Sequence, residues 1–233
     1  MTDCKKNNNE LTCKDAYEVF SSVENIPFCE YMTDTELEKL TSSANKGKVG
    51  QLMEILIGKE LDSEHLDFPD GELKCVTTDE NGVMPSGQSI FVTNIGKHVD
   101  DMLDLIPFQD SWVHEKTKHM VLVGICYLDK DDASTWFITC VYDCDFQNDS
   151  KLTDLYTVLE SEYDELCLRT LDMVVDEGHM GGCAKGLNYV EHRPKNAGTT
   201  VSALCGNSVI YDKVKAIYLK RGFFNDIVQA FAA

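Results

Sequence analysis

The sequence predicts an α/β fold of the α+β kind, in which helices flank a mixed β-sheet. Segments with a helical period lie toward both ends of the chain, whereas two runs rich in β-branched and aromatic residues, 120–128 and 134–142, lie in its middle. No linker rich in Gly, Pro or Ser interrupts the 233 residues. We therefore expect one domain, 1–233.

Three N-terminal segments carry apolar residues at helical spacing: 14–25, 34–44 and 47–58. Thr33 or Asp34 can cap the second of these helices, and Glu36 follows at the spacing of a capping box. The third has a broad apolar stripe that ends at Gly58, which predicts a buried helix.

Four strands are expected after these helices. "ELKCVTT" (72–78) and "SIFVTNI" (89–95) are joined by the turn-rich "DENGVMPSG". "MVLVGICYL" (120–128) and "STWFITCVY" (134–142) flank the acidic loop "DKDDA", which predicts a hairpin of central strands.

The C-terminal third begins with a long helical pattern over 151–174. A glycine-rich stretch, 177–186, then breaks this pattern. Short strands and loops follow, and a last amphipathic helix is expected over 222–231.

The net charge of −19 at first argues against a nucleic-acid partner, because a uniformly acidic surface repels DNA. The distribution of charge weakens this argument. Segment 185–224 carries seven lysines and arginines against Glu191 and Asp212, so its net charge is +5 and the remainder of the chain carries −24. A basic region of this kind can still contact a polyanion.

The N-terminus indicates an intracellular, cytoplasmic protein, a setting for which ten cysteines are many. The first residues lack the apolar stretch of a signal peptide, and no apolar run is long enough to span a membrane. The ten cysteines form no repeated C-x-x-C pair, so we expect buried free thiols rather than disulfides or zinc sites. The six histidines likewise show no metal-ligand spacing.

The stretch "LDFPDGELKC" (66–75) places three carboxylates and a lysine beside the start of a predicted strand. Residues two apart in a strand share a face, so Glu72 and Lys74 point the same way and Leu73 points to the other side. Two carboxylates can hold Mg²⁺ beside a phosphate, and a neighbouring ammonium can position water or neutralise charge. Taken alone, the stretch is also typical of an ordinary acidic turn before a strand.

Four motifs in order, "KGKVGQLMEILIG", "DFPDGELK", "EHRPKNA" and "IYLKRGF", resemble the MutH-like DNA endonucleases. This family of the PD-(D/E)xK class comprises the mismatch-repair nickase MutH and related GATC-specific type II restriction enzymes. The resemblance extends from about residue 46 to the C-terminus and is loose in the middle of the chain.

The resemblance implies a catalytic group of Asp67, Glu72, Lys74, Glu54 and Lys116. The three acids among them would bind Mg²⁺, for which Mn²⁺ is expected to substitute. Only four residues separate Asp67 from Glu72, which is shorter than the spacing of the family, so Asp70 competes for the role of first ligand. We prefer Asp67 because "DFP" matches the family, whereas Asp70-Gly71 is typical of a turn.

The same resemblance assigns DNA contacts to five further residues: Lys46, Arg193, Pro194, Lys195 and Tyr218. Arg193 and Pro194 match a loop that enters the major groove and reads bases, where an arginine can bind guanine in a bidentate manner. Tyr218 matches the aromatic residue that senses adenine methylation.

The implied fold is restriction-endonuclease-like, with two arms forming a DNA cleft. The N-terminal arm, about 1–105, would carry most catalytic residues, and the C-terminal arm, about 106–233, would carry the recognition loop. The implied activity is Mg²⁺-dependent cleavage of double-stranded DNA at GATC, with a homodimer on DNA as one arrangement.

We favour a restriction enzyme, because the strong acidity and the many cysteines are unlike the repair enzyme. The first alternative is a repair nickase at hemimethylated GATC, activated by a MutL-like partner. The second is a non-catalytic DNA-binding or DNA-mimic protein. The intact Glu72-Leu73-Lys74 argues against inactivation, and the basic segment argues against mimicry.

Overall fold

The structure, a computed structural model, describes residues 11–41, 48–58, 66–95, 98–180, 183–194, 200–205, 208–213 and 215–232. Its α-helices are α1 Cys13–Ser22, α2 Asp34–Thr41, α3 Lys48–Leu56, α4 Val99–Leu103, α5 Trp112–Thr117, α6 Thr153–Glu177 and α7 Arg221–Ala232. Its strands are β1 Glu72–Thr78, β2 Ser89–Asn94, β3 His119–Cys126, β4 Phe137–Asp145, β5 Val190–Pro194, β6 Thr200–Cys205, β7 Ser208–Lys213 and β8 Lys215–Lys220. Short 3₁₀ turns lie at Phe28–Glu30, Phe108–Asp110, Ala133–Thr135 and Ser150–Leu152.

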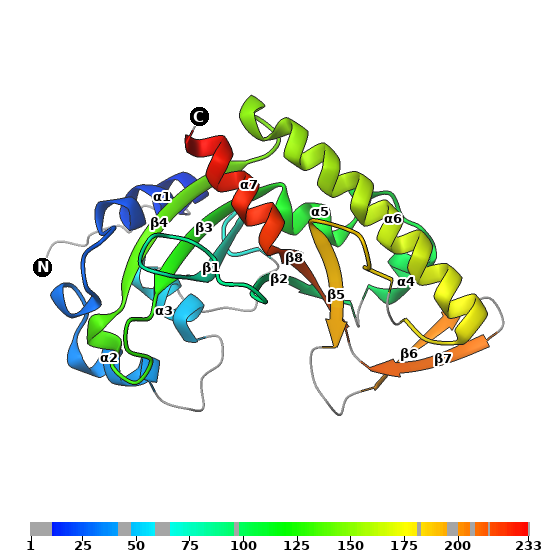
Figure 1. The fold of residues 1–233 in the computed structure, drawn as a ribbon, viewed down its shortest axis with the longest axis horizontal. Helices are drawn as coiled ribbons and strands as arrows, with labels where there is room; N and C mark the ends of the chain where they lie inside the picture. The colour runs from blue at the N-terminus through cyan, green and yellow to red at the C-terminus, as the bar shows by residue number, and fades with distance from the viewer. Residues whose placement is uncertain are drawn as a thin grey trace, which may run out of the picture.

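The predicted mixed α/β architecture is confirmed (Figure 1). One sheet has the order β1-β3-β4, in which β1 and β3 are parallel and β3 and β4 are antiparallel. A second, antiparallel sheet has the order β2-β8-β5, and β6 pairs with β7 in a separate hairpin. Strands β1 and β2 are consecutive in the chain and yet belong to different sheets. The expected division near residue 105 therefore does not separate the two sheets.

Strand β3 is the centre of the first sheet, and it is buried on both faces. Met120 and Leu122 pack into one hydrophobic cluster, whereas Val121, Val123 and Ile125 pack into another. Because side chains alternate along a strand, each cluster lies on its own side of the sheet. The continuous apolar run in the sequence is explained by this double burial.

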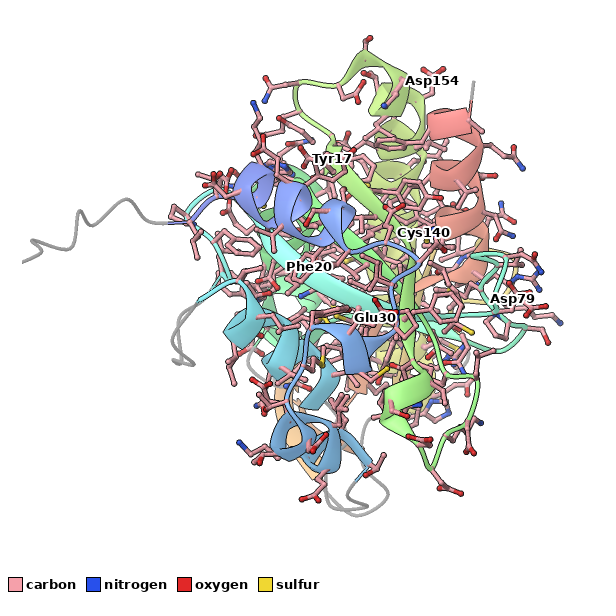
Figure 2. All side chains as sticks on the ribbon, turned by 90° about the vertical axis from the view of Figure 1, so that its left-hand side faces the viewer. Tyr17, Phe20, Glu30, Asp79, Cys140 and Asp154 are labelled. Carbon is pink, nitrogen blue, oxygen red and sulfur yellow. The ribbon has the colours of Figure 1, made fainter. Side chains whose placement is uncertain are left out.

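The two faces of the first sheet are covered by different helices. Helix α1 lies across β3 and β4 on one face, where Figure 2 shows Phe20 on the inner side of the helix. The other cluster includes residues of α6 and α7, such as Leu159 and Phe224, together with Leu219 of the second sheet. This shared cluster joins the two sheets into one structure.

Local sequence signals explain where several helices begin and end. The Glu36 carboxylate accepts hydrogen bonds from the backbone nitrogen and the hydroxyl of Thr33, at 2.8 and 2.7 Å, as the capping-box spacing predicts. Gly178 follows α6 with a φ of 73°, and its backbone nitrogen donates to the Val174 carbonyl at 3.0 Å.

Some predicted boundaries were displaced. The helix expected over 14–25 ends at Ser22, and Asn25 has a positive φ of 60°. The strand expected from residue 134 begins at Phe137, because Asp132 accepts hydrogen bonds from Ser134 and holds a 3₁₀ turn there. None of the helices in the described ranges is both long and apolar enough to cross a membrane.

Eight of the described cysteines form no disulfide with one another: Cys13, Cys29, Cys75, Cys126, Cys140, Cys144, Cys167 and Cys183. Five of these are buried, as expected (Cys13, Cys126, Cys144, Cys167 and Cys183), whereas Cys29 is exposed.

Candidate functional site

The parallel pairing of β1 with β3 places the predicted catalytic residues beside helix α5. Glu72 opens β1 and lies opposite Met120, close to the point where α5 leads into β3. Lys116 belongs to the last turn of α5, so this junction carries it to the start of β1. A residue 44 positions away in the sequence thereby contacts Glu72.

Glu72 is a buried carboxylate held between two ammonium groups. Lys74 Nζ donates to Glu72 Oε2, and Lys116 Nζ donates to Glu72 Oε1. Burial raises the pKa of Glu72 above its ordinary value; the charge of Lys74 opposes this shift, that of Asp67 adds to it, and Lys116 opposes it. Glu72 thus depends on the two lysines for the stabilisation of its charge.

Asp67 lies at the edge of this group. Its Oδ2 accepts a hydrogen bond from the backbone nitrogen of Leu73 at 2.9 Å and lies 3.9 Å from Lys74 Nζ. A tight turn between Phe68 and Gly71, closed by backbone hydrogen bonds of 2.9 and 3.3 Å, holds it there, and the buried Phe68 anchors the turn. The structure therefore brings Asp67 to the start of β1.

Asp70, the competing aspartate, points elsewhere. Its Oδ1 accepts a hydrogen bond from the backbone nitrogen of Cys13 at 2.9 Å, and its Oδ2 lies 3.7 Å from His119 Nδ1. Of the two aspartates, Asp67 is the one that the contacts place beside Glu72 and Lys74.

Glu54 lies on α3, which packs against β1. Its side chain is half-buried. Burial raises the pKa of Cys75 to about 12; Lys74 opposes this shift, and the charges of Glu54 and Asp67 add to it. The charge of Glu54 thus acts on the thiol of Cys75 in β1. Hydrogen bonds and ion pairs join the other four predicted catalytic residues into one group, which we call the β1 carboxylate–lysine group: Asp67, Glu72, Lys74 and Lys116.

The predicted DNA-contacting residues lie on the second sheet. Arg193 and Pro194 end β5, and Tyr218 lies in the neighbouring β8. The Arg193 guanidinium carbon is 5.9 Å from the centre of the Tyr218 ring, and its Nη2 pairs with Glu191 Oε1 at 2.5 Å. Lys46 and Lys195 lie outside the described residues.

Two aromatic residues that the sequence analysis did not single out lie beside these predicted residues. The Phe91 ring on β2 meets Tyr218 edge-on with centroids 5.7 Å apart, and the Trp112 ring lies 5.4 Å from Lys116 Nζ. Phe91 lies opposite Tyr218 because β2 pairs with β8, which no local sequence signal indicates. Trp112 and Lys116 are four residues apart in α5, and this helical spacing is the signal that could have pointed to Trp112.

Comparison of the chain with protein-family models and with curated proteins found no match.

Proposed function

We propose that this protein is a Mg²⁺-dependent endonuclease that cleaves both strands of DNA at GATC, as a type II restriction enzyme. The observation that carries the proposal is the β1 carboxylate–lysine group, in which two carboxylates and two ammonium groups converge from a loop, a strand and a helix. In this proposal the fold is restriction-endonuclease-like, and its N-terminal arm (about 1–105) and C-terminal arm (about 106–233) would form a DNA cleft.

The donor atoms of the group suit Mg²⁺, because they are carboxylate oxygens, the ligands that this ion prefers. Asp67 and Glu72 would hold the ion, with Glu54 as the third acid on the neighbouring helix. Mn²⁺ shares the preference for oxygen and would substitute. When bound, the ion polarises the scissile phosphate and lowers the pKa of a water molecule.

The lysines supply the positive charge that the reaction needs at the phosphate. Glu72 holds both ammonium groups at the start of β1, so neither has to be recruited from solvent. Lys74 would donate a hydrogen bond that orients the attacking water, and Lys116 would donate to a phosphate oxygen as negative charge builds there. Trp112 limits the freedom of Lys116 by lying against its ammonium group.

Recognition of the site is assigned to Arg193 and Tyr218. Arg193 is partly exposed and held between Glu191 and the Tyr218 ring, so its guanidinium is oriented before DNA binds. A planar guanidinium can donate two parallel hydrogen bonds to guanine. Binding would replace the ion pair with Glu191 by these hydrogen bonds.

Replacing Arg193 by alanine is expected to reduce discrimination between GATC and a site with its guanine changed by ~1–3 kcal/mol, because the bidentate contact is lost. Cleavage rates on the two duplexes, compared for wild type and variant, measure this discrimination. R193K keeps the charge and loses the bidentate geometry, so its discrimination should fall as well. R169A is the matched control, because Arg169 pairs with Glu165 on α6. Unchanged discrimination in R193A would remove Arg193 from base recognition.

The function itself is tested with wild-type protein and no partner protein. We expect cleavage of both strands of an unmethylated GATC duplex in Mg²⁺ and no cleavage in excess EDTA. Unmethylated, hemimethylated and fully methylated duplexes are digested in parallel. Nicking confined to hemimethylated DNA, and only after a MutL-like activator is added, would favour the repair alternative. Binding of the duplex in Ca²⁺ without cleavage in Mg²⁺ would favour a non-catalytic DNA-binding protein, and failure to bind DNA would exclude both nucleases.

A further inference from the structure

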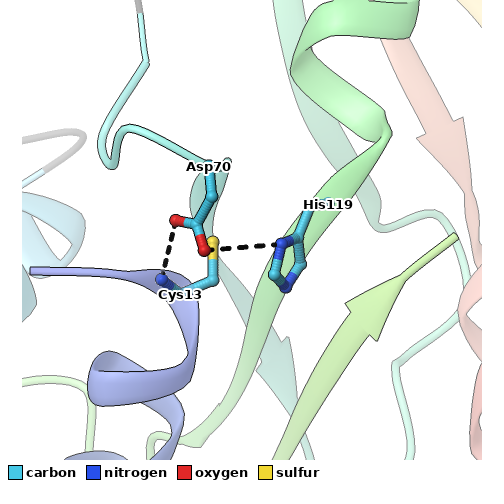
Figure 3. A group of neighbouring side chains, drawn as sticks. All are labelled: Cys13, Asp70 and His119. Atoms are coloured by element: carbon cyan, nitrogen blue, oxygen red, sulfur yellow. Dashed lines mark hydrogen bonds and ion pairs between the residues drawn. The ribbon is translucent and has the colours of Figure 1, made fainter. Parts of the chain in front are cut away.

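Three side chains from distant parts of the chain meet beside the loop that carries Asp67 and Asp70, away from Glu72 and Lys74. Cys13 opens α1, Asp70 lies in the loop before β1, and His119 opens β3 (Figure 3). One sulfur, one carboxylate oxygen and one ring nitrogen of these residues all lie within 4.8 Å of one another. We call this set the Cys13–Asp70–His119 cluster.

We propose that the Cys13–Asp70–His119 cluster binds Zn²⁺ or a closely similar first-row transition ion. Thiolate sulfur and imidazole nitrogen select this class of ion over Mg²⁺ and Ca²⁺, which prefer oxygen alone. The ligands of a tetrahedral zinc lie about 2.0–2.3 Å from the metal and hence roughly 3.5 Å from one another. The separation of 3.7 Å between Asp70 Oδ2 and His119 Nδ1 matches this spacing.

His119 is oriented for this role by a second carboxylate. Its Nε2 lies 2.7 Å from Asp143 Oδ1, on the neighbouring strand β4. When Nε2–H donates to Asp143, the lone pair of Nδ1 is left facing Asp70 and Cys13. A carboxylate behind a histidine in this manner is the usual support of a metal-binding imidazole.

Close backbone contacts also hold the three residues of the cluster together. A Cβ atom on Gly71 would lie 2.3 Å from the His119 carbonyl oxygen and 2.7 Å from Cys13 Sγ, so only glycine allows the loop to approach this closely. The Cys13 backbone nitrogen donates to the other oxygen of Asp70 at 2.9 Å. Three segments of the chain are thereby held together before any ion binds.

Binding replaces the Cys13 S–H bond by a sulfur–metal bond, and the proton passes to solvent. Asp70 and His119 contribute lone pairs, and water fills the fourth position of the ion. Asp70 is the most exposed of the three side chains, at 39 %, which leaves a path for the ion and for this water. The bound ion would tie α1 to the loop that carries Asp67 and would leave the β1 carboxylate–lysine group to a different metal.

The test uses the full chain, freed of metal with a chelator, and needs no DNA. Titration with Co²⁺ should produce an absorption band from thiolate-to-cobalt charge transfer, and this band should saturate at one equivalent of Co²⁺. Added Zn²⁺ should displace Co²⁺ and abolish the band. C13S should lose the band, and H119Q should weaken Zn²⁺ binding at least 100-fold in competition with a chromophoric chelator. D143N, which changes the carboxylate behind His119, should weaken Zn²⁺ binding 10–100-fold.

C167S is the matched control, because Cys167 is a buried cysteine on α6 and its loss should leave binding unchanged. Circular dichroism establishes that each variant is folded. A wild-type protein without the thiolate-to-cobalt band overturns the proposal whatever the variants do, and so does a band that persists at full strength in folded C13S. Metal binding is measured here without cleavage, so a failed nuclease assay and a failed zinc site are separate results.

Discussion

Replacing Lys74 by alanine is expected to lower the rate of GATC cleavage by ~10²–10³-fold, the effect of removing one preorganised donor from a site of charge stabilisation. Lys74 Nζ contacts the Glu72 carboxylate and lies 3.9 Å from Asp67, so in the proposed site it would donate to the attacking water beside these acids. The rate should be measured in a single turnover at saturating Mg²⁺ and protein, so that weakened DNA binding is not mistaken for slow chemistry.

The control for this variant is K118A. Lys118 follows α5 and pairs with Glu115 at 2.8 Å, so its loss removes the same charge from the same region without touching Glu72. If K74A cleaves as fast as K118A, the β1 carboxylate–lysine group is not the catalytic site. DNA affinity in Ca²⁺ should remain similar for both variants, because each has lost one lysine.

Replacing Phe108 by alanine should reduce the free energy of unfolding by about 3–5 kcal/mol, the usual cost of deleting a buried ring. Phe108 is fully buried, and its ring centroid lies 5.3–5.5 Å from those of His114, Tyr156 and Tyr163. These neighbours belong to α5 and α6, so relaxation of one side chain cannot fill the cavity. Urea denaturation followed by circular dichroism measures the change.

Leu168 on α6 provides the comparison, because it is 52 % exposed. L168A should alter the free energy of unfolding by no more than about 0.5 kcal/mol. A loss below about 1 kcal/mol for F108A would mean that the aromatic packing around α5 and α6 is looser than described.

The sequence predicts best those features that depend on neighbouring residues. The capping-box spacing of Thr33 and Glu36 was identified in advance, and the glycine-rich stretch 177–186 was expected to break the helical pattern near the point where α6 ends at Gly178. The hairpin of β3 and β4 follows from two apolar runs separated by a short acidic loop. The β1 carboxylate–lysine group was found because three of its four members lie within eight residues, and Lys116 was added by resemblance alone.

Features that depend on contacts between residues far apart in the sequence could not be predicted from local patterns. Nothing in the local pattern of β2 indicates that it leaves β1 and pairs with β8, because the same alternation of side chains suits either partner. Cys13, Asp70 and His119 show no metal-ligand spacing in the sequence, because the fold brings them together from the start of α1, the loop before β1 and the start of β3. The histidines were for this reason expected to have no role in metal binding.

The order in which the chain contributes strands to the first and second sheets has a consequence for folding. It contributes β1 to the first sheet and β2 to the second, returns to the first for β3 and β4, and completes the second with β5 and β8. Neither sheet can be completed from one contiguous stretch, so both depend on contacts between residues far apart in the chain. High contact order of this kind slows folding. A nascent chain that ends before β8 would lack the central strand of the second sheet.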